Sequence, residues 1–171
     1  YRAMINLNEK KTSIFSLYFS SGLTLLGASI LEIIFSSLLW FSLSIPLTLM
    51  VLIYWNVATP KNTGFFWTMI SGFILDLYLG YFLGVHVIVF LLASYLTQRY
   101  FHRFRALFRI QQSIIVAAII FIYQIYFILI SNYFSTSIFA ELIVLTFISS
   151  FFWPIIYGLL RYLRIKLTYG K

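Results

Sequence analysis

The stretch NTGFFWTMISGFILDLYLGYFLGVH, residues 62–86, places one acidic residue, Asp76, between two apolar runs. Small or polar residues recur along it at every fourth position: Gly64, Thr68, Gly72, Asp76, Gly80 and Gly84. On a helix this spacing forms one stripe, and small residues let helices approach closely in lipid. Gly80 and Gly84 predict a tight turn into a second helix. The stretch therefore predicts two closely packed helices inside a membrane.

The composition extends this prediction to the whole chain. Its 171 residues are 62% hydrophobic and include only 12 Lys and Arg and four Asp and Glu. An average soluble domain of this size would have roughly 43 charged residues, so a soluble fold could not cover its surface. We therefore expect an integral membrane protein with a single polytopic domain over residues 1–171. The length leaves no room for a separate soluble enzymatic domain.

Charge-free windows, divided at turn residues, predict six membrane-spanning helices in a compact all-α bundle. The expected spans are 13–33, 45–59, 63–79, 83–99, 111–131 and 138–160. All 12 cations precede the first span, follow the last, or lie in the second and fourth of the five loops. The positive-inside rule then places both termini in the cytoplasm. The second and third spans are short, which predicts that elements pack inside the bundle.

Asp76 is the most informative single residue, because a carboxylate within a bilayer is costly. It lies about one turn from the end of its span, so it is expected to accept hydrogen bonds from backbone donors at the turn. The alternative is a polar site for a ligand, a proton or a partner, with His86 and Gln124 as the nearest candidates. Glu32 and Glu141 fall at span ends, where we expect them to be solvated. They could also contact a periplasmic partner.

A second stripe of small residues lies in the first span. Ser20, Thr24 and Ala28 follow one another at four-residue intervals and lead to Glu32. This stripe is expected either to face a partner helix or to pack within the bundle. The same two interpretations stay open for the stripe from Gly64 to Gly84.

Six arginines form the candidate cytoplasmic contact: Arg99, Arg103, Arg105, Arg109, Arg161 and Arg164. Aromatic residues alternate with the first four, as in surfaces that bind single-stranded nucleic acid. A basic loop between spans more simply meets anionic headgroups or a cytoplasmic protein, so no nucleic acid is expected. The sequence has neither a phosphate-binding loop nor a nucleophile–base pair nor a metal-ligand cluster. We therefore predict no enzymatic activity, metal or cofactor.

Parts of the chain resemble the MreD family of rod shape-determining proteins. The resemblance is strongest over residues 46–112 and rests on Asn62-Thr63-Gly64, Gly72 to Leu77, Leu83-Gly84-Val85, Gln111-Gln112, and Trp153-Pro154 followed by Arg161. It implies a non-catalytic part of the bacterial cell-elongation machinery in the inner membrane. The implied partners are MreC, the actin-like MreB, the RodA glycosyltransferase and a class B penicillin-binding protein, in a complex that could hold more than one copy of this chain.

The resemblance also carries an alternative. The family's fold is similar to the six-helix substrate-binding subunit of energy-coupling-factor vitamin transporters. The alternative function is therefore a membrane subunit that binds a small solute in a pocket near the outer face, around Asp76 and nearby aromatic residues.

Overall fold

The computed structural model describes residues 2–38, 43–60, 65–80, 82–131 and 135–169, with side chains between residues 15 and 166. Within these ranges the chain folds into helices. They are α1 (Arg2–Leu38), α2 (Leu47–Ala58), α3 (Phe65–Leu79), α4 (Val85–Arg99), α5 (Phe101–Ala106), α6 (Arg109–Ser131) and α7 (Thr136–Tyr169).

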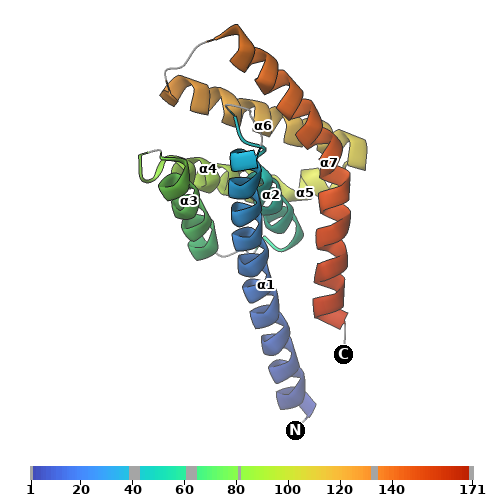
Figure 1. Cartoon of the computed structure of the whole chain (residues 1–171). Coiled ribbons are helices and arrows are strands. Elements are labelled where there is room, and N and C mark those ends of the chain that lie inside the picture. Colours follow the sequence, from blue (N-terminus) through green and yellow to red (C-terminus); the bar gives the residue numbers. More distant parts are fainter. Residues whose placement is uncertain (1, 39–42, 61–64, 81, 132–134, 170–171) are drawn as a thin grey trace.

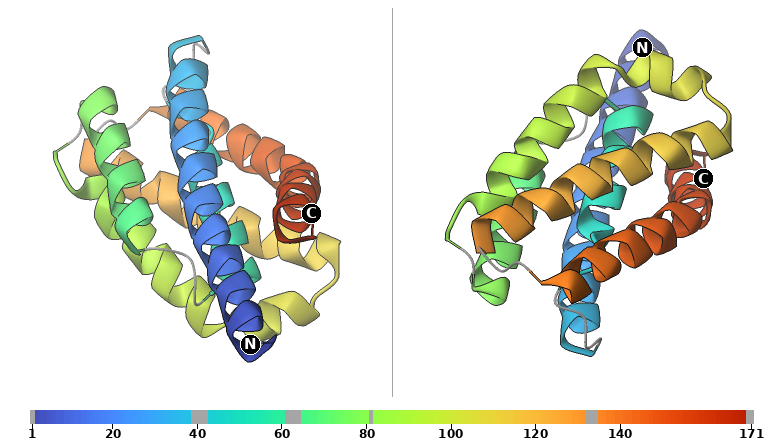
Figure 2. Two further views of the ribbon diagram at one scale, coloured as in Figure 1. Left: turned by 90° about the horizontal axis from the view of Figure 1, so that it is seen from below. Right: turned by 90° about the horizontal axis from the view of Figure 1, so that it is seen from above.

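The two long terminal helices define the shape of the molecule (Figure 1). α1 runs along its length, α3 and α4 lie on one side of α1, and α7 descends on the other. α6 crosses above them, and both chain ends lie at the same end of the molecule. Figure 2 shows α2 behind α1 in the middle of the bundle, where it packs against α1, α4, α5 and α7.

Three helices are long and apolar enough to cross a membrane: Phe15–Leu38 of α1, Arg109–Ser131 of α6, and Thr136–Lys166 of α7. The apolar helices α2, α3 and α4 have 12, 15 and 15 residues. At 1.5 Å per residue they are about 18–22 Å long, shorter than the roughly 30 Å of bilayer hydrocarbon. The structure confirms an all-helical membrane protein, and the crossing of the membrane by all six helices stays a prediction.

Glycine and proline set several of the helix ends. α2 lies between Pro46 and Pro60, and α3 and α4 are separated by Gly80 and Gly84, whose φ angles are +71° and +103°. Glycine adopts such positive angles without steric cost. By contrast, Pro154 lies within α7 and does not end it, although Figure 1 shows that α7 changes direction along its length.

The core of the molecule is built around α2. Every residue from Thr48 to Val57 is buried, including Tyr54 and Trp55. Side chains from the surrounding helices complete the core, among them Leu25, Phe90, Ile120 and Trp153. This burial agrees for the second span with the prediction that elements pack inside the bundle, whereas only five of the 15 residues of the other short span, α3, are buried. The burial of α2 leaves the outward faces of the other helices to meet lipid.

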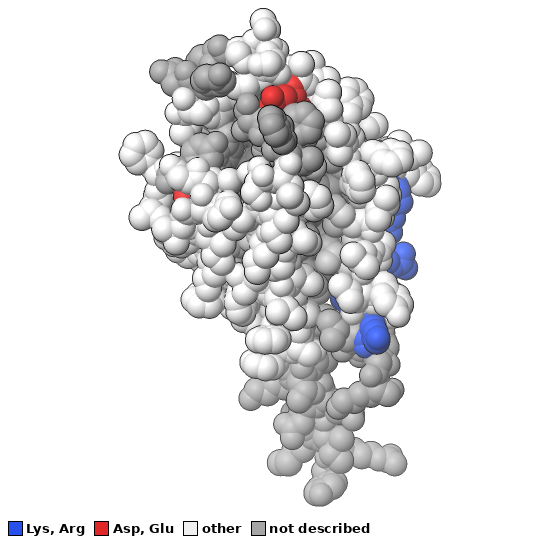
Figure 3. All heavy atoms as spheres, viewed as in Figure 1, with Lys and Arg blue, Asp and Glu red and all other residues white. Residues whose placement is uncertain are grey.

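Charged side chains are unevenly placed on the surface. On the face drawn in Figure 3, Lys and Arg gather toward the end of the molecule that holds the chain termini, and the acidic side chains lie nearer the other end. That this end of the molecule faces the cytoplasm stays a prediction of the positive-inside rule.

Candidate functional site

Asp76 connects the end of α3 to the beginning of α4. Its Oδ2 accepts a hydrogen bond from the Gly84 backbone N–H at 2.7 Å, and its Oδ1 accepts one from the His86 backbone N–H at 2.9 Å. The His86 side chain also contacts Oδ1, through Nδ1 at 2.6 Å. The first backbone N–H groups of a helix lack partners within it, and its dipole favours a negative charge there. Asp76 therefore closes the turn, and one of its two expected partners, His86, contacts it.

Gln124, the other expected partner of Asp76, takes part in a different contact. Its Oε1 accepts a hydrogen bond from the Thr146 hydroxyl at 3.3 Å, which joins α6 to α7. The Gln124 side chain is nevertheless buried close to His86, because both line the cavity described below.

The stripe of small residues on α3 packs against α4. A methyl group at Gly72 would lie 2.9 Å from the Cα and backbone N of Val87, so only glycine fits without a shift. Thr68 is also buried, whereas Gly64 lies outside the described residues. Thr68 and Gly72 thus support helix packing within the chain, whereas Gly80 and Gly84 lie in the turn, where a Cβ would meet nothing within 4 Å.

The stripe on α1 likewise points into the bundle. Ser20 and Ala28 are buried, and the Thr24 hydroxyl accepts a hydrogen bond from the Trp55 indole N–H at 2.8 Å. The outward face of α1 instead has large apolar side chains, such as Phe19 and Leu23. A partner that approaches α1 from the lipid would meet that apolar face.

Glu32 is not solvated, which corrects the expectation from its position at a span end. Its side chain is fully buried, and Oε2 accepts a hydrogen bond from the Thr48 backbone N–H at 2.9 Å. The Ser44 hydroxyl donates to Oε1 at 3.4 Å. Glu32 of α1 therefore caps the beginning of α2, as Asp76 caps α4. Glu141 is half-buried in α7.

Two of the six predicted cytoplasmic arginines hold the other end of α2. Arg105 donates through Nε to the Val57 carbonyl oxygen at 2.6 Å and through Nη2 to that of Ala58 at 2.7 Å. Arg164 donates to the same Ala58 oxygen at 3.2 Å. Cations are favoured there, because the last carbonyls of a helix carry negative partial charge. α2 thus has an acid at its beginning and two cations at its end.

The other four arginines are exposed and differ in their contacts. Arg109 lies 3.6 Å from the ring centre of Tyr157 and donates to Gln112. Arg99, Arg103 and Arg161 are exposed. The loop expected between the fourth and fifth spans also contains the short helix α5, which the sequence analysis did not predict.

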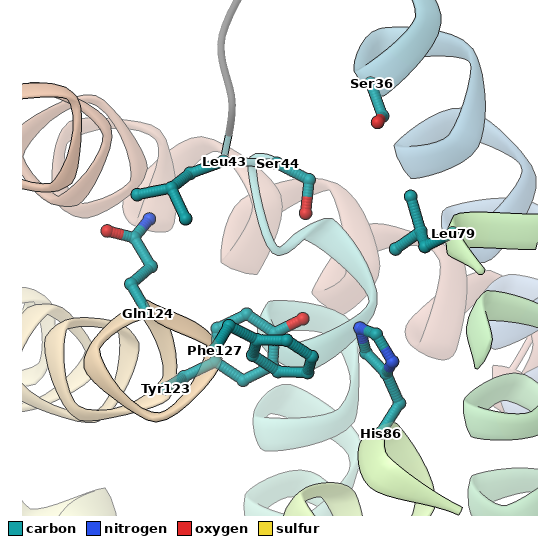
Figure 4. Close-up of a pocket in the computed structure, with 8 residues that line it drawn as sticks. All are labelled: Ser36, Leu43, Ser44, Leu79, His86, Tyr123, Gln124 and Phe127. Carbon is teal, nitrogen blue, oxygen red and sulfur yellow. The ribbon is translucent and has the colours of Figure 1, made fainter. Parts of the chain in front are cut away.

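A cavity of about 240 Å³ lies beside the Asp76–His86 pair (Figure 4). Four helices and the segment before α2 contribute to its lining: Ser36, Leu43, Ser44, Leu79, His86, Tyr123, Gln124 and Phe127. Tyr123 and Phe127 present their rings, and the Phe127 ring centre lies 4.3 Å from that of His86. Sequence reasoning identified His86 and Gln124 but missed the rest, because lining residues from separate helices share no sequence pattern.

The described residues contain no group of three or more His, Cys, Asp or Glu that could hold a metal ion. The buried acidic residues Glu32 and Asp76 instead cap helix ends, and buried neutral groups such as Asn56 and Ser94 join neighbouring helices. Their chemistry suits positioning of helices and recognition of a neutral group in the cavity.

Comparison of the sequence with known proteins identifies a family and one relative. Residues 13–163 match the family of rod shape-determining protein MreD. The chain is similar to the rod shape-determining protein MreD of Haemophilus influenzae, with 31% identity over 118 residues that cover 68% of this chain and 73% of the relative. No solved structure matches, so the similarity to the energy-coupling-factor subunit stays a prediction.

Proposed function

Because this chain belongs to the MreD family of rod shape-determining membrane proteins, we propose that it is a non-catalytic inner-membrane component of the bacterial cell-elongation complex. It binds MreC directly and helps to organise lateral peptidoglycan synthesis with MreB, RodA and a class B penicillin-binding protein. Both of its termini face the cytoplasm.

One observation supports an assembly role over a chemical one. The buried acidic residues Glu32 and Asp76, together with the exposed Arg105, are engaged in capping helix ends within the chain. What the helices offer to a neighbour in the membrane is therefore a set of apolar faces. Such faces bind another helix by close packing, without chemistry.

We place the MreC helix on the outward face of α7. Of the three long apolar helices, α7 has the least buried apolar window, 22% compared with 33% for α1 and for α6. Phe147, Phe151 and Ile155 are exposed along it, and Gly158 has open space where a Cβ would lie. A glycine on an outward face lets a second helix approach closely.

The test is a pull-down of the tagged chain from its native membrane in mild detergent, with mass spectrometry of the recovered proteins. We expect MreC, MreB and the elongation synthases. Recovery of two ATPases and a coupling subunit instead would overturn the proposal in favour of a transporter subunit.

Two glycines make the test specific to one surface. Gly158→Leu on α7 should lower the recovery of MreC, and Gly27→Leu on α1 should not. A Cβ at either position meets nothing within 4 Å, so both variants should fold. Unchanged recovery with Gly158→Leu would remove α7 from the interface. Changing the exposed Arg99, Arg103 and Arg161 to Glu should reduce the recovery of MreB alone.

A further inference from the structure

We propose that the groove between the beginning of α3 and the end of α4 binds one phospholipid with an anionic headgroup that carries hydroxyls, such as phosphatidylglycerol. This inference goes beyond the role in cell elongation and does not depend on it. The argument rests on the position of the groove, on the order of chemical groups along α4, and on the charge beside its polar end.

The groove is a second cavity, of about 230 Å³, between two helices that pack closely at their other ends. Near the turn that joins them, Gly72 of α3 approaches the Val87 backbone of α4. Farther from the turn the two helices leave a space, which is lined by Phe65, Thr68, Leu91, Ser94, Tyr95 and Gln98. Phe65 and Tyr95 are 65% and 61% exposed, so the groove opens on the outer surface of the bundle, where a membrane protein meets lipid.

Along α4, the side chains of the groove change from apolar to polar toward the end of the helix. Leu91, Tyr95 and Gln98 lie on one face, because residues three and four apart are neighbours on a helix. The exposed Arg99 follows directly. The rise from Leu91 to Arg99 is about 12 Å. A phospholipid has the same order of groups, so its acyl chain lies between Leu91 and Phe65 and its headgroup at Gln98 and Arg99.

The polar end of the groove offers donors and an acceptor. The Tyr95 hydroxyl and the Arg99 guanidinium lie one helical turn apart, and both donate to phosphate oxygens. Gln98 donates through Nε2 to Asn56 Oδ1 at 2.9 Å, and its Oε1 accepts no hydrogen bond from the described residues. This oxygen is not fully buried, so it can accept from a headgroup hydroxyl. Phosphatidylglycerol has such hydroxyls, and phosphatidylcholine has none.

Charge favours an anionic lipid over a zwitterionic one. Arg99 and Arg103 are both exposed, and neither forms an ion pair within the described part of the chain. Of the described residues that line the groove, none is acidic. A choline group beside Arg99 would meet a like charge, whereas a glycerol headgroup adds no charge to that of the phosphate. Basic sites between membrane helices on the cytoplasmic side bind anionic headgroups in this way.

Thermal unfolding of the purified full chain in a neutral detergent tests the proposal, with dioleoyl phosphatidylglycerol and dioleoyl phosphatidylcholine as probes that have identical chains. A ligand that binds the native state raises the apparent melting temperature. We expect a saturable rise with phosphatidylglycerol at a concentration about tenfold lower than phosphatidylcholine requires, the effect of one net polar contact. Glycerol 3-phosphate, which lacks the chains, should give no rise. Equal responses to the two lipids would overturn the proposal, as would a rise with glycerol 3-phosphate equal to that with phosphatidylglycerol.

Two matched pairs of variants assign the effect to the groove. Tyr95→Phe keeps the ring but removes the hydroxyl, and it should raise the half-saturating concentration of phosphatidylglycerol about tenfold. Tyr162→Phe, at a similarly exposed ring on α7, should leave it unchanged. Leu91→Trp should fill the groove and abolish the rise, whereas Leu92→Trp changes the exposed neighbour, which does not line the groove. A rise that persists unchanged in both Tyr95→Phe and Leu91→Trp would place the lipid elsewhere and reject this site.

Discussion

Charged side chains make hydrogen bonds that hold the ends of the short helices, whereas the side-chain hydrogen bonds described between α6 and α7 join neutral groups. Arg109 of α6 also lies over the Tyr157 ring of α7. Among α1 to α5, Glu32 and Asp76 accept hydrogen bonds from backbone N–H groups at the beginnings of α2 and α4, and Arg105 donates to a carbonyl at the end of α2. Between α6 and α7, the Thr146 hydroxyl donates to Gln124 at 3.3 Å, and the Ser150 hydroxyl donates to the Ser113 carbonyl at 3.2 Å.

This difference separates two tasks within one small membrane protein. A buried charge is tolerated only where its partners are in place, so the charged contacts specify one arrangement of the short helices. Neutral hydroxyl contacts between long helices are weaker and easier to replace. We infer that the charged contacts specify the arrangement of the short helices around α2, and that the outward faces of α6 and α7 supply surface for lipid and partners.

Loss of Asp76 should have the largest effect. Asp76→Leu leaves two backbone N–H groups and the His86 side chain without their acceptor, so the free energy of unfolding should fall by about 3–5 kcal/mol. Asp76→Asn keeps one acceptor oxygen and should lose less. Denaturant unfolding of the purified chain measures both. If Asp76→Leu and the parent were equally stable, the claim that charged contacts specify the arrangement of the short helices would be wrong.

A matched pair of glycines gives an intermediate effect of opposite sign. Gly72→Ala would place a methyl group 2.9 Å from the Val87 backbone, and such overpacking should cost about 1–3 kcal/mol. Gly158→Ala on α7 meets open space and should gain about 0.5–1 kcal/mol, because alanine suits a helix better than glycine. The same unfolding assay compares them. If both variants shifted stability in the same direction, the contrast between interior and outer surface would fail at these positions.

The smallest effect is expected at the contact between α6 and α7. Thr146→Val removes the hydroxyl that bonds to Gln124 and should cost about 0.6 kcal/mol, the average for such contacts in a membrane. Thr24→Val is the matched change in the interior, where it leaves the Trp55 indole N–H without its acceptor. It should cost more than Thr146→Val. If Thr146→Val lowered the free energy of unfolding in urea more than Thr24→Val, the neutral contacts between α6 and α7 would contribute at least as much stability as the interior contact.

Helix positions could be predicted wherever a local signal marks the boundary. The expected spans 63–79 and 83–99 agree closely with Phe65–Leu79 and Val85–Arg99, because Gly80 and Gly84 interrupt the apolar run. The first span was predicted over 13–33, and the apolar span of α1 begins close by, at Phe15, although the helix itself begins at Arg2 and the span continues to Leu38. The charges at Lys10 and Lys11 end an apolar window, yet they do not end a helix. For the same reason α5, which is rich in arginine, was missed.

Side-chain roles could be predicted only when the partner is near in sequence. The bonds from Asp76 to Gly84 and His86 span eight and ten residues, and the intervening glycines indicate the turn. Glu32 bonds to Thr48 across 16 residues and Arg105 to Val57 across 48. Neither periodicity nor charge pattern indicates such distant pairing, so Glu32 was wrongly expected to be solvated, and the contact of Arg105 with the end of α2 was not predicted.

The capped ends of α2 also have a consequence for the order of synthesis. Glu32 leaves the ribosome before α2, so the acceptor for the Thr48 N–H is already present when that helix is made. The donors at the other end come later: Arg105 follows Val57 by 48 residues, and Arg164 follows Ala58 by 106. At about 5–20 residues per second, the Ala58 carbonyl waits roughly 5–20 s for Arg164. The central helix of the bundle is therefore completed only as the last helix arrives, and a truncated chain lacks one of its cations.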